Sequence, residues 1–216
     1  MIVSFGIYFI GVVALSLMLV KKRYIIFIIL TVIALFFLHH MITAYSADEE
    51  KIEVALTINV YENTDVDSLL LMLSDIKATF FISEEFENLH GDKLIKLADY
   101  GHDIGLLEND FENKSIREIN DHLAKRIENL AFLSGQNCQC VRFKDNIYSA
   151  KSIMAVNDLH LTAVQWSATE ADKIYSMGDI ILVEDCRLIS EAVDTLSYCD
   201  YKVVDIESLI KNKLTD

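Results

Sequence analysis

The hydrophobic pattern divides the chain into an apolar front part and a longer part in which short apolar runs recur. Residues 2–20 are 19 positions without a charged side chain, and a second apolar run from residue 24 to about 45 follows Lys21, Lys22 and Arg23. As a helix, the first run would be about 28 Å long, close to the ~30 Å of a membrane's hydrocarbon core. We therefore predict two transmembrane helices within residues 1–45, joined by a basic turn at 21–23.

A secretory signal peptide is the competing interpretation of this segment. The basic residues of a signal peptide precede its apolar stretch, however, and Tyr45, Ser46 and Ala47 make a poor small-x-small cleavage site. The uncleaved hairpin is therefore preferred. Because basic turns remain in the cytoplasm, the expected protein is a two-span protein of the cell membrane whose main domain is extracytoplasmic.

Behind an acidic linker at residues 46–51, apolar β-rich runs alternate with helical patterns. Strands are predicted at 54–60, 78–82, 103–107, 139–143, 161–166, 179–183 and 202–206, and helices at 65–74, 92–100, 115–133, 150–158 and 189–197. Such alternation is typical of a parallel α/β sheet. We predict one domain over residues 52–212, a seven-stranded parallel (β/α) barrel that is closed or nearly closed.

The helix predicted at 115–133 has the clearest local signals. Ser115 and Glu118 have the spacing of a capping box, apolar residues recur at three- and four-residue steps as far as Leu130, and Gly135 follows as a stop. One face of this helix is therefore expected to pack on the sheet.

Charge and cysteine content exclude several classes of protein. With 33 Asp and Glu against 19 Lys and Arg, the net charge of −14 disfavours binding of nucleic acid. The four cysteines are too few and too irregularly spaced for a disulfide scaffold or a paired zinc site. One or two disulfide bridges remain open, and at least two of these residues are expected to be small buried hydrophobes: Cys138, Cys140, Cys186 and Cys199.

Three short motifs resemble those of a known family. The chain reads V-A-L-T-I-N-V at 54–60, A-T-F-F at 78–81 and G-H-D-I-G at 101–105. In this order and spacing they resemble the polysaccharide deacetylases (the NodB-homology domain, or carbohydrate esterase family 4), which carry V-A-L-T-F-D-D-G-P, A-T-F-F and G-H-E-I-G-N-H-x-x-x-H. The resemblance covers about residues 54–209, and it implies a barrel of the polysaccharide deacetylase type.

The resemblance also implies a metal-dependent site, which this chain lacks. In the family, one aspartate and two histidines hold a divalent metal, and a neighbouring aspartate acts as the base. The base and metal-aspartate positions here are Asn59 and Val60, and the two histidine positions are Leu107 and Phe111. Val60, Leu107 and Phe111 are apolar and cannot ligate a metal, and we expect Phe111 to pack inward near Leu107 and Val60 as part of the core.

Four further positions carry over from later motifs. The family's acid histidine corresponds to Glu184, which Asp185 follows. Arg142 remains from the R-x-P-x-G motif, whose proline and glycine are replaced here. Trp166 matches the aromatic residue of the family's following strand. Asp185 and Arg142 are expected to have structural roles, paired with each other or with nearby carboxylates. The whole set of degenerate positions is Asn59, Val60, Leu107, Phe111, Arg142, Trp166, Glu184 and Asp185, and we expect no catalytic residue, metal or other cofactor.

The histidine and the two glycines of the G-H-D-I-G motif are expected to have structural roles. His102, inside G-H-D-I-G, precedes the strand and is expected to be structural. Gly101 and Gly105 are expected to serve a tight turn.

Three functions compete at this point. The preferred one is an anchored, catalytically inactive deacetylase-like protein that binds a cell-envelope glycan or a membrane or envelope protein. The second is an amide or ester hydrolase acting on a cell-wall polysaccharide through rebuilt chemistry, and the third is a structural component of a membrane complex. Residues available for a rebuilt site are Glu62, Glu108, Asp110, Glu184, Asp185, Cys138, Cys140 and Cys186.

Overall fold

The computed structural model describes residues 31, 32, 35, 51–172 and 174–215, with side chains as far as residue 210. No helix among these residues is long and apolar enough to cross a membrane. The predicted hairpin at 1–45 lies almost wholly outside the described residues. Residues 51–216 form a compact unit separate from residues 1–50, and only this unit is considered below.

A parallel sheet forms the centre of this unit. Seven strands follow the order β5-β4-β3-β2-β1-β7-β6, and an eighth, β8, pairs with the start of β1. The strands are β1 (Glu53–Val60), β2 (Thr79–Ile82), β3 (Asp103–Glu108), β4 (Cys140–Phe143), β5 (Thr162–Ala163), β6 (Ala168–Thr169), β7 (Ile180–Val183) and β8 (Lys202–Val203). Within the described residues no ladder joins β5 to β6, so the barrel predicted as closed or nearly closed is an open half-barrel.

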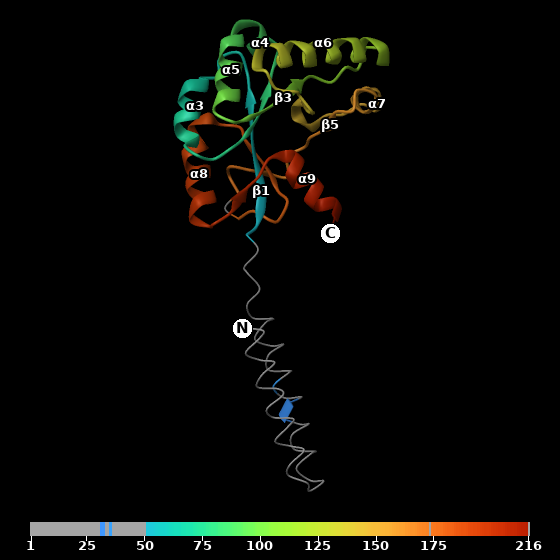
Figure 1. Ribbon diagram of the computed structural model, residues 1–216. Coiled ribbons are helices and arrows are strands. Elements are labelled where there is room, and N and C mark those ends of the chain that lie inside the picture. Colours follow the sequence, from blue (N-terminus) through green and yellow to red (C-terminus); the bar gives the residue numbers. More distant parts are fainter. Residues whose placement is uncertain (1–30, 33–34, 36–50, 173, 216) are drawn as a thin grey trace. The chain divides into compact units, whose positions relative to one another are not determined.

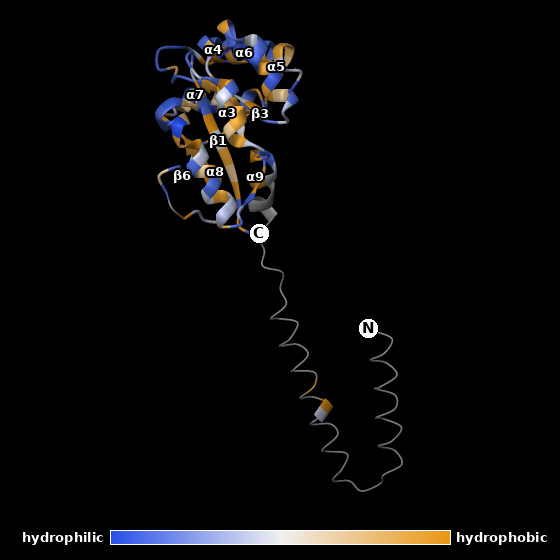
Figure 2. Cartoon of the chain, turned by 90° about the vertical axis from the view of Figure 1, so that its left-hand side faces the viewer, coloured by the Kyte–Doolittle hydropathy of each residue, from blue (hydrophilic) through white to orange (hydrophobic). Residues whose placement is uncertain are grey.

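Helices alternate with the strands, as the sequence predicted. They are α3 (Val66–Leu73), α4 (Glu84–Leu89), α5 (Gly91–Asp99), α6 (Ile116–Ser134), α7 (Ala150–Asp158), α8 (Ile189–Tyr198) and α9 (Ile206–Thr215), with short 3-10 turns η1 (Lys144–Asn146) and η2 (Cys186–Leu188). Figure 1 shows α3 and α8 side by side along β1, with α9 on the other side of that strand. Figure 2 shows a strongly hydrophobic β1 among helices that carry both hydrophilic and hydrophobic residues.

Alternation of side chains along the strands produces two apolar clusters. In β1, Leu56, Ile58 and Val60 belong to the large cluster that the outer helices cover, whereas Ala55 belongs to a smaller one. The smaller cluster fills the concave side of the half-barrel and includes Phe81, Leu107, Val164, Ile206 and Leu209. The interior of the half-barrel is therefore packed with hydrocarbon beneath the carboxyl ends of its strands.

Local signals explain the ends of α6. The Ser115 Oγ accepts from the Glu118 backbone N–H at 3.3 Å, and a Glu118 carboxylate oxygen accepts from the Ser115 backbone N–H at 2.8 Å. Gly135 ends the helix with φ +73°. The predicted capping box and stop are both confirmed, and the helix is displaced by a single residue from the predicted range.

The two glycines expected at one turn have different roles. Gly101 has φ +77°, which confirms the turn before β3. Gly105 lies inside β3, where a Cβ would come within 2.7 Å of the Cys140 Sγ and 2.8 Å of a Phe81 ring carbon. The prediction was wrong for Gly105, which is required by close packing on the concave face.

Other differences from the predicted elements concern short segments. The strands predicted at 161–166 and 202–206 shrink to two residues each, and β6 was not predicted. Helix α4 was missed because it has only six residues, and α9 because the predicted strand ran into it. Short elements carry too few turns of periodic sequence to be recognised locally.

Candidate functional site

Three of the site positions, Asn59, Leu107 and Arg142, lie next to the carboxyl ends of the parallel strands β1, β3 and β4. Asn59 is the penultimate residue of β1, and Arg142 lies in β4, in register with Leu107 of β3. The Arg142 Nη1 donates to the Asn59 Oδ1 at 3.2 Å. The arginine and the amide at the family's base position are therefore direct neighbours.

Arg142 is a fully buried cation in an aromatic environment. Its side chain is 0 % exposed, and its Cζ lies 4.1 Å from the centroid of the Phe81 ring and 5.5 Å from that of Trp166. Burial lowers the pKa of Arg142 to about 10, so the guanidinium remains protonated at neutral pH. Its Nε and Nη2 atoms are buried and have no hydrogen-bond partner among the described residues.

The apolar site positions are parts of the core. Val60, Leu107 and Phe111 are 0 %, 2 % and 6 % exposed. Phe111 packs edge-on against the Phe143 ring, with 6.1 Å between the centroids, and against the His122 ring at 5.3 Å. Burial of all three residues is confirmed.

These three residues do not form one plug, however. Val60 and Phe111 belong to the cluster under the outer helices, whereas Leu107 belongs to the concave cluster. The prediction that they pack together was wrong for Leu107, because residues 107 and 111 lie in β3 and in the loop after it and leave the sheet on different sides.

A divalent metal does not fit these positions. Metal binding at the family's site needs carboxylate and imidazole donors, and the corresponding side chains here are hydrocarbon and buried. The base position carries the neutral Asn59 amide, and it is bonded to the Arg142 cation, which repels a metal ion. Among residues 51–172 and 174–210, no group of three or more His, Cys, Asp or Glu side chains could hold a metal.

The remaining predicted positions lie at the rim. Trp166 is half-buried in the loop between β5 and β6, and Glu184 is exposed directly after β7. Asp185 forms an ion pair with Arg187 at 2.6 Å, and hydrogen bonds from Arg187 lower the Asp185 pKa to about 2. Asp185 and Arg142 were expected to pair with each other or with nearby carboxylates, and among the described residues they do neither: Asp185 pairs with Arg187 two residues away, and Arg142 donates to the neutral Asn59 amide.

His102 lies away from this edge, as expected of a structural residue. It is 2 % exposed at the start of β3, where its Nδ1 accepts from the Ala78 backbone N–H at 3.2 Å. Burial, with a smaller contribution from Lys77, lowers the His102 pKa to about 4. The neutral ring therefore serves as a hydrogen-bond acceptor that joins β2 to β3.

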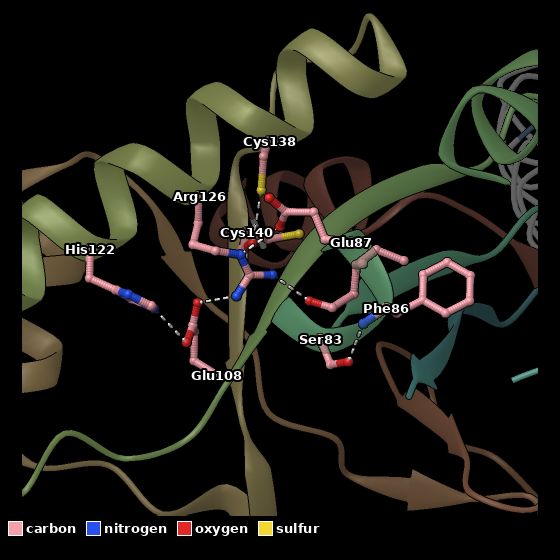
Figure 3. A network of polar contacts seen from close by, with 9 residues as sticks. Ser83, Phe86, Glu87, Glu108, His122, Arg126, Cys138 and Cys140 are labelled. Carbon is pink, nitrogen blue, oxygen red and sulfur yellow. Dashed lines mark hydrogen bonds and ion pairs between the residues drawn. The ribbon is translucent and has the colours of Figure 1, made fainter. Parts of the chain in front are cut away.

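A buried ionic network that was not predicted from the sequence lies beside the site (Figure 3). The Arg126 Nε donates to a Glu87 carboxylate oxygen at 2.6 Å, its Nη1 to Glu108 at 2.7 Å, and its Nη2 to the Ile82 carbonyl at 2.9 Å. The His122 Nε2 lies 3.2 Å from the other Glu108 oxygen. The network ties α4 and α6 to the end of β3.

One sequence signal could have revealed this network. The buried positions of α6 are Ile119, Leu123, Arg126 and Leu130, at steps of four, three and four residues. An arginine in an otherwise apolar stripe requires a buried carboxylate partner. Glu108, which the sequence offered only as a carboxylate for a rebuilt site, ends β3 and is 5 % exposed.

Comparison with solved structures identifies the architecture. A family 4 carbohydrate esterase from Bacillus anthracis superposes with a TM-score of 0.67 at 24 % identity, covering 76 % of this chain and 84 % of the esterase. The chain has the fold of the family 4 carbohydrate esterases. No family model matches the sequence, and no curated protein matches it.

Two further solved structures with this carbohydrate esterase fold are a deacetylase and a pseudoenzyme. The peptidoglycan deacetylase PdaC from Bacillus subtilis, as a point mutant, has a TM-score of 0.64 at 16 % identity and covers 78 % of this chain and 95 % of its own. A pseudoenzyme of the same esterase family from Bacillus anthracis has a TM-score of 0.65 at 20 % identity, covering 74 % and 66 %. The family 4 fold is thus found with and without activity, so function here must be argued from this chain's residues.

Proposed function

We propose that this chain is a membrane-anchored, extracytoplasmic protein that has lost deacetylase chemistry and binds a cell-envelope glycan at the carboxyl edge of its half-barrel. The supporting observation is that buried hydrocarbon stands at the metal positions, at Val60, Leu107 and Phe111, with a neutral Asn59 at the base position. Metal-assisted hydrolysis needs a polarised carbonyl and an activated water. Neither can be supplied from these side chains.

Aromatic side chains at the rim support a glycan as the ligand. Tyr61 follows β1 and is 46 % exposed, and the Lys144 Nζ lies 5.5 Å from the centroid of its ring. The half-buried Trp166 covers the Arg142 guanidinium. Tyrosine and tryptophan offer a flat apolar face together with a polar edge, which suits a sugar ring. One structure of similar fold is a peptidoglycan deacetylase, which makes cell-wall glycan the first ligand class to test.

A membrane or envelope protein is the second candidate partner. Large apolar side chains are strongly exposed on three outer helices: Leu71 on α3, Phe132 on α6 and Tyr198 on α8. Single exposed apolar residues are common on monomers, so these carry less weight than the aromatic rim.

A rebuilt hydrolase is the weaker alternative because its candidate carboxylates are engaged separately. Asp110 accepts hydrogen bonds from the Ser149 N–H and the Ser152 hydroxyl, Glu108 is bound to Arg126, and Asp185 to Arg187. A general acid and base would have to converge on one substrate.

The candidate thiols do not support a rebuilt nucleophile either. The four cysteines are free, and burial raises the pKa of Cys138 to about 11, that of Cys140 well above its usual range, and that of Cys186. Only a thiolate is a good nucleophile, and raised pKa values disfavour it.

The anchor and localisation rest on residues 1–45 of the sequence. Impermeant thiol labelling of intact cells, with single-cysteine variants placed after Ala47, tests the proposed orientation. We expect labelling without lysis, because Lys21, Lys22 and Arg23 carry the topogenic charge. Labelling only after lysis would reverse the orientation.

Activity and binding are tested on the full-length chain purified in mild detergent. We expect no acetate release from N-acetylglucosamine oligomers above a protein-free blank, with or without added zinc. We also expect co-sedimentation with insoluble peptidoglycan that Tyr61→Ala and Trp166→Ala weaken. Tyr198→Ala is the matched control, since Tyr198 is 92 % exposed on a different element. Acetate release at a rate set by added metal would refute the loss of chemistry.

A further inference from the structure

One edge of the Arg142 guanidinium is without a partner. Nη1 is hydrogen-bonded to Asn59, whereas Nε and Nη2 are buried and unpaired among the described residues. The N–H groups of these two nitrogens project from the same side of the planar guanidinium, with the spacing of the two oxygens of a carboxylate. The unpaired atoms therefore form a complete bidentate donor rather than two scattered defects.

The charge of Arg142 is also uncompensated. Its contacts are the Asn59 amide and the Phe81 and Trp166 rings, none of which carries a charge. No carboxylate among the described residues is bonded to it. A buried cation with unsatisfied donors is strongly unfavourable unless an anion or other acceptor joins it.

The position of this guanidinium gives a ligand a route to it. Arg142 lies at the carboxyl ends of parallel strands, the edge at which α/β sheets bind their ligands. Of the three residues in contact with it, Phe81 is buried, while Asn59 and Trp166 are partly exposed. A ligand that approaches from solvent beside Asn59 would have to displace the half-buried Trp166 side chain, whose ring centroid lies 5.5 Å from the Arg142 Cζ.

We infer that the Nε–Nη2 edge of Arg142 binds the carboxylate of a small anionic ligand, either a carboxylate carried by a sugar or a free aliphatic acid. The inference names the chemical class of ligand for the site, and its sugar-borne form rests on the proposed glycan-binding function. In place of the cation of a metal enzyme, this edge of the half-barrel takes an anion.

The only tryptophan of the chain reports on this site. Because Trp166 is the single Trp in 216 residues and lies against Arg142, its fluorescence changes when a ligand enters beside the guanidinium. The full-length chain, in mild detergent and about 150 mM salt, is titrated with glucuronate, acetate and glucose. We expect a saturable change with glucuronate and none with glucose. A response to acetate of equal affinity identifies a free-acid site, and a much weaker one identifies a sugar acid.

Three variants assign the response to the guanidinium fork. Arg142→Met removes the charge, and Arg142→Lys keeps a charge without the fork. Each should weaken glucuronate binding at least roughly tenfold, as expected for loss of a charged hydrogen-bonded pair. Arg117→Met, at an arginine 91 % exposed on α6, is the control and should leave binding unchanged. A thermal melt of each variant verifies that it is folded.

The inference is overturned by no response to either acid, by an equal response to glucose, or by wild-type affinity in folded Arg142→Met. Failure of the proposed function gives a different result. Peptidoglycan binding that needs Trp166 but not Arg142 would keep the glycan function and remove the anion site. Acetate binding through Arg142 without peptidoglycan binding would keep the anion site and remove the glycan function.

Discussion

Replacement of Arg126 by methionine is the sharpest test of the forces that hold the site in place. Arg126 is 3 % exposed and is the shared partner of Glu87 and Glu108, which are 2 % and 5 % exposed. Methionine has a similar length and packs well in irregular space, so the change removes charge and hydrogen bonds rather than volume. Two carboxylates would then remain buried without their cation.

The expected loss can be worked out from these contacts. Removing one partner of a buried ion pair costs about 3–5 kcal/mol, and the hydrogen bond to the Ile82 carbonyl adds about 1 kcal/mol. The total of about 4–6 kcal/mol is a large part of a typical stability of 5–15 kcal/mol. For a domain of this size, each kcal/mol lowers Tm by about 2–4 °C, so Tm should fall by roughly 8–24 °C.

Urea and thermal denaturation of the wild type and variants provide the assay. Arg117→Met is the control: it removes an exposed ion pair in which the Arg117 Nε lies 3.9 Å from an Asp121 carboxylate oxygen, and it should lower the free energy of unfolding by less than about 0.5 kcal/mol. The triple variant Glu87→Leu, Arg126→Met and Glu108→Leu should recover most of the loss, since an apolar replacement of a whole buried network is often neutral or stabilising. A loss below about 1 kcal/mol for Arg126→Met alone would refute the reasoning.

Three other outcomes are expected. Asn59→Asp gives Arg142 a counter-charge and should stabilise the fold by about 1–3 kcal/mol at pH 7; because the new carboxylate's folded pKa is depressed, the gain is present above pH ~4 and lost as pH falls through that folded value. A gain in melting temperature over the wild type that is the same at pH 3 as at pH 7 would contradict this. Burial holds the His102 pKa at about 4, so stability should fall by up to about 1.4 kcal/mol per pH unit as pH drops from ~6.5, and His102→Gln should flatten this slope in denaturant titrations at pH 5.0–6.5. Elemental analysis after dialysis against trace zinc should find no stoichiometric metal, and one tightly held zinc per chain would oppose the loss of metal chemistry.

The sequence alone determined the elements that are long or strongly patterned. The apolar run at 54–60 became β1, and the capped periodic segment at 115–133 became α6, each within one residue. Local physics is sufficient for these, because side-chain alternation, helical spacing and caps act between near neighbours. The parallel alternation of strands and helices followed from their order along the chain.

Only the tertiary structure decided the short elements and the partners of the polar residues. Strands β5, β6 and β8 are pairs of residues that become strands because a longer neighbour offers hydrogen bonds, and the open edge between β5 and β6 has no local signature. The sequence identified Asn59 as a replaced position and Arg142 as a retained position of the degenerate site. It did not reveal that two nitrogens of Arg142 remain unpaired.

The Arg126 network makes the physical reason plain. Arg126 meets Glu87, 39 residues away, and Glu108, 18 residues away, because α4, α6 and β3 converge at one end of the sheet. The periodicity of α6 determined that residue 126 faces inward. Which carboxylates meet it there depends on the packing of distant segments, since a buried charge is stabilised only by groups that the whole fold brings within a few ångströms.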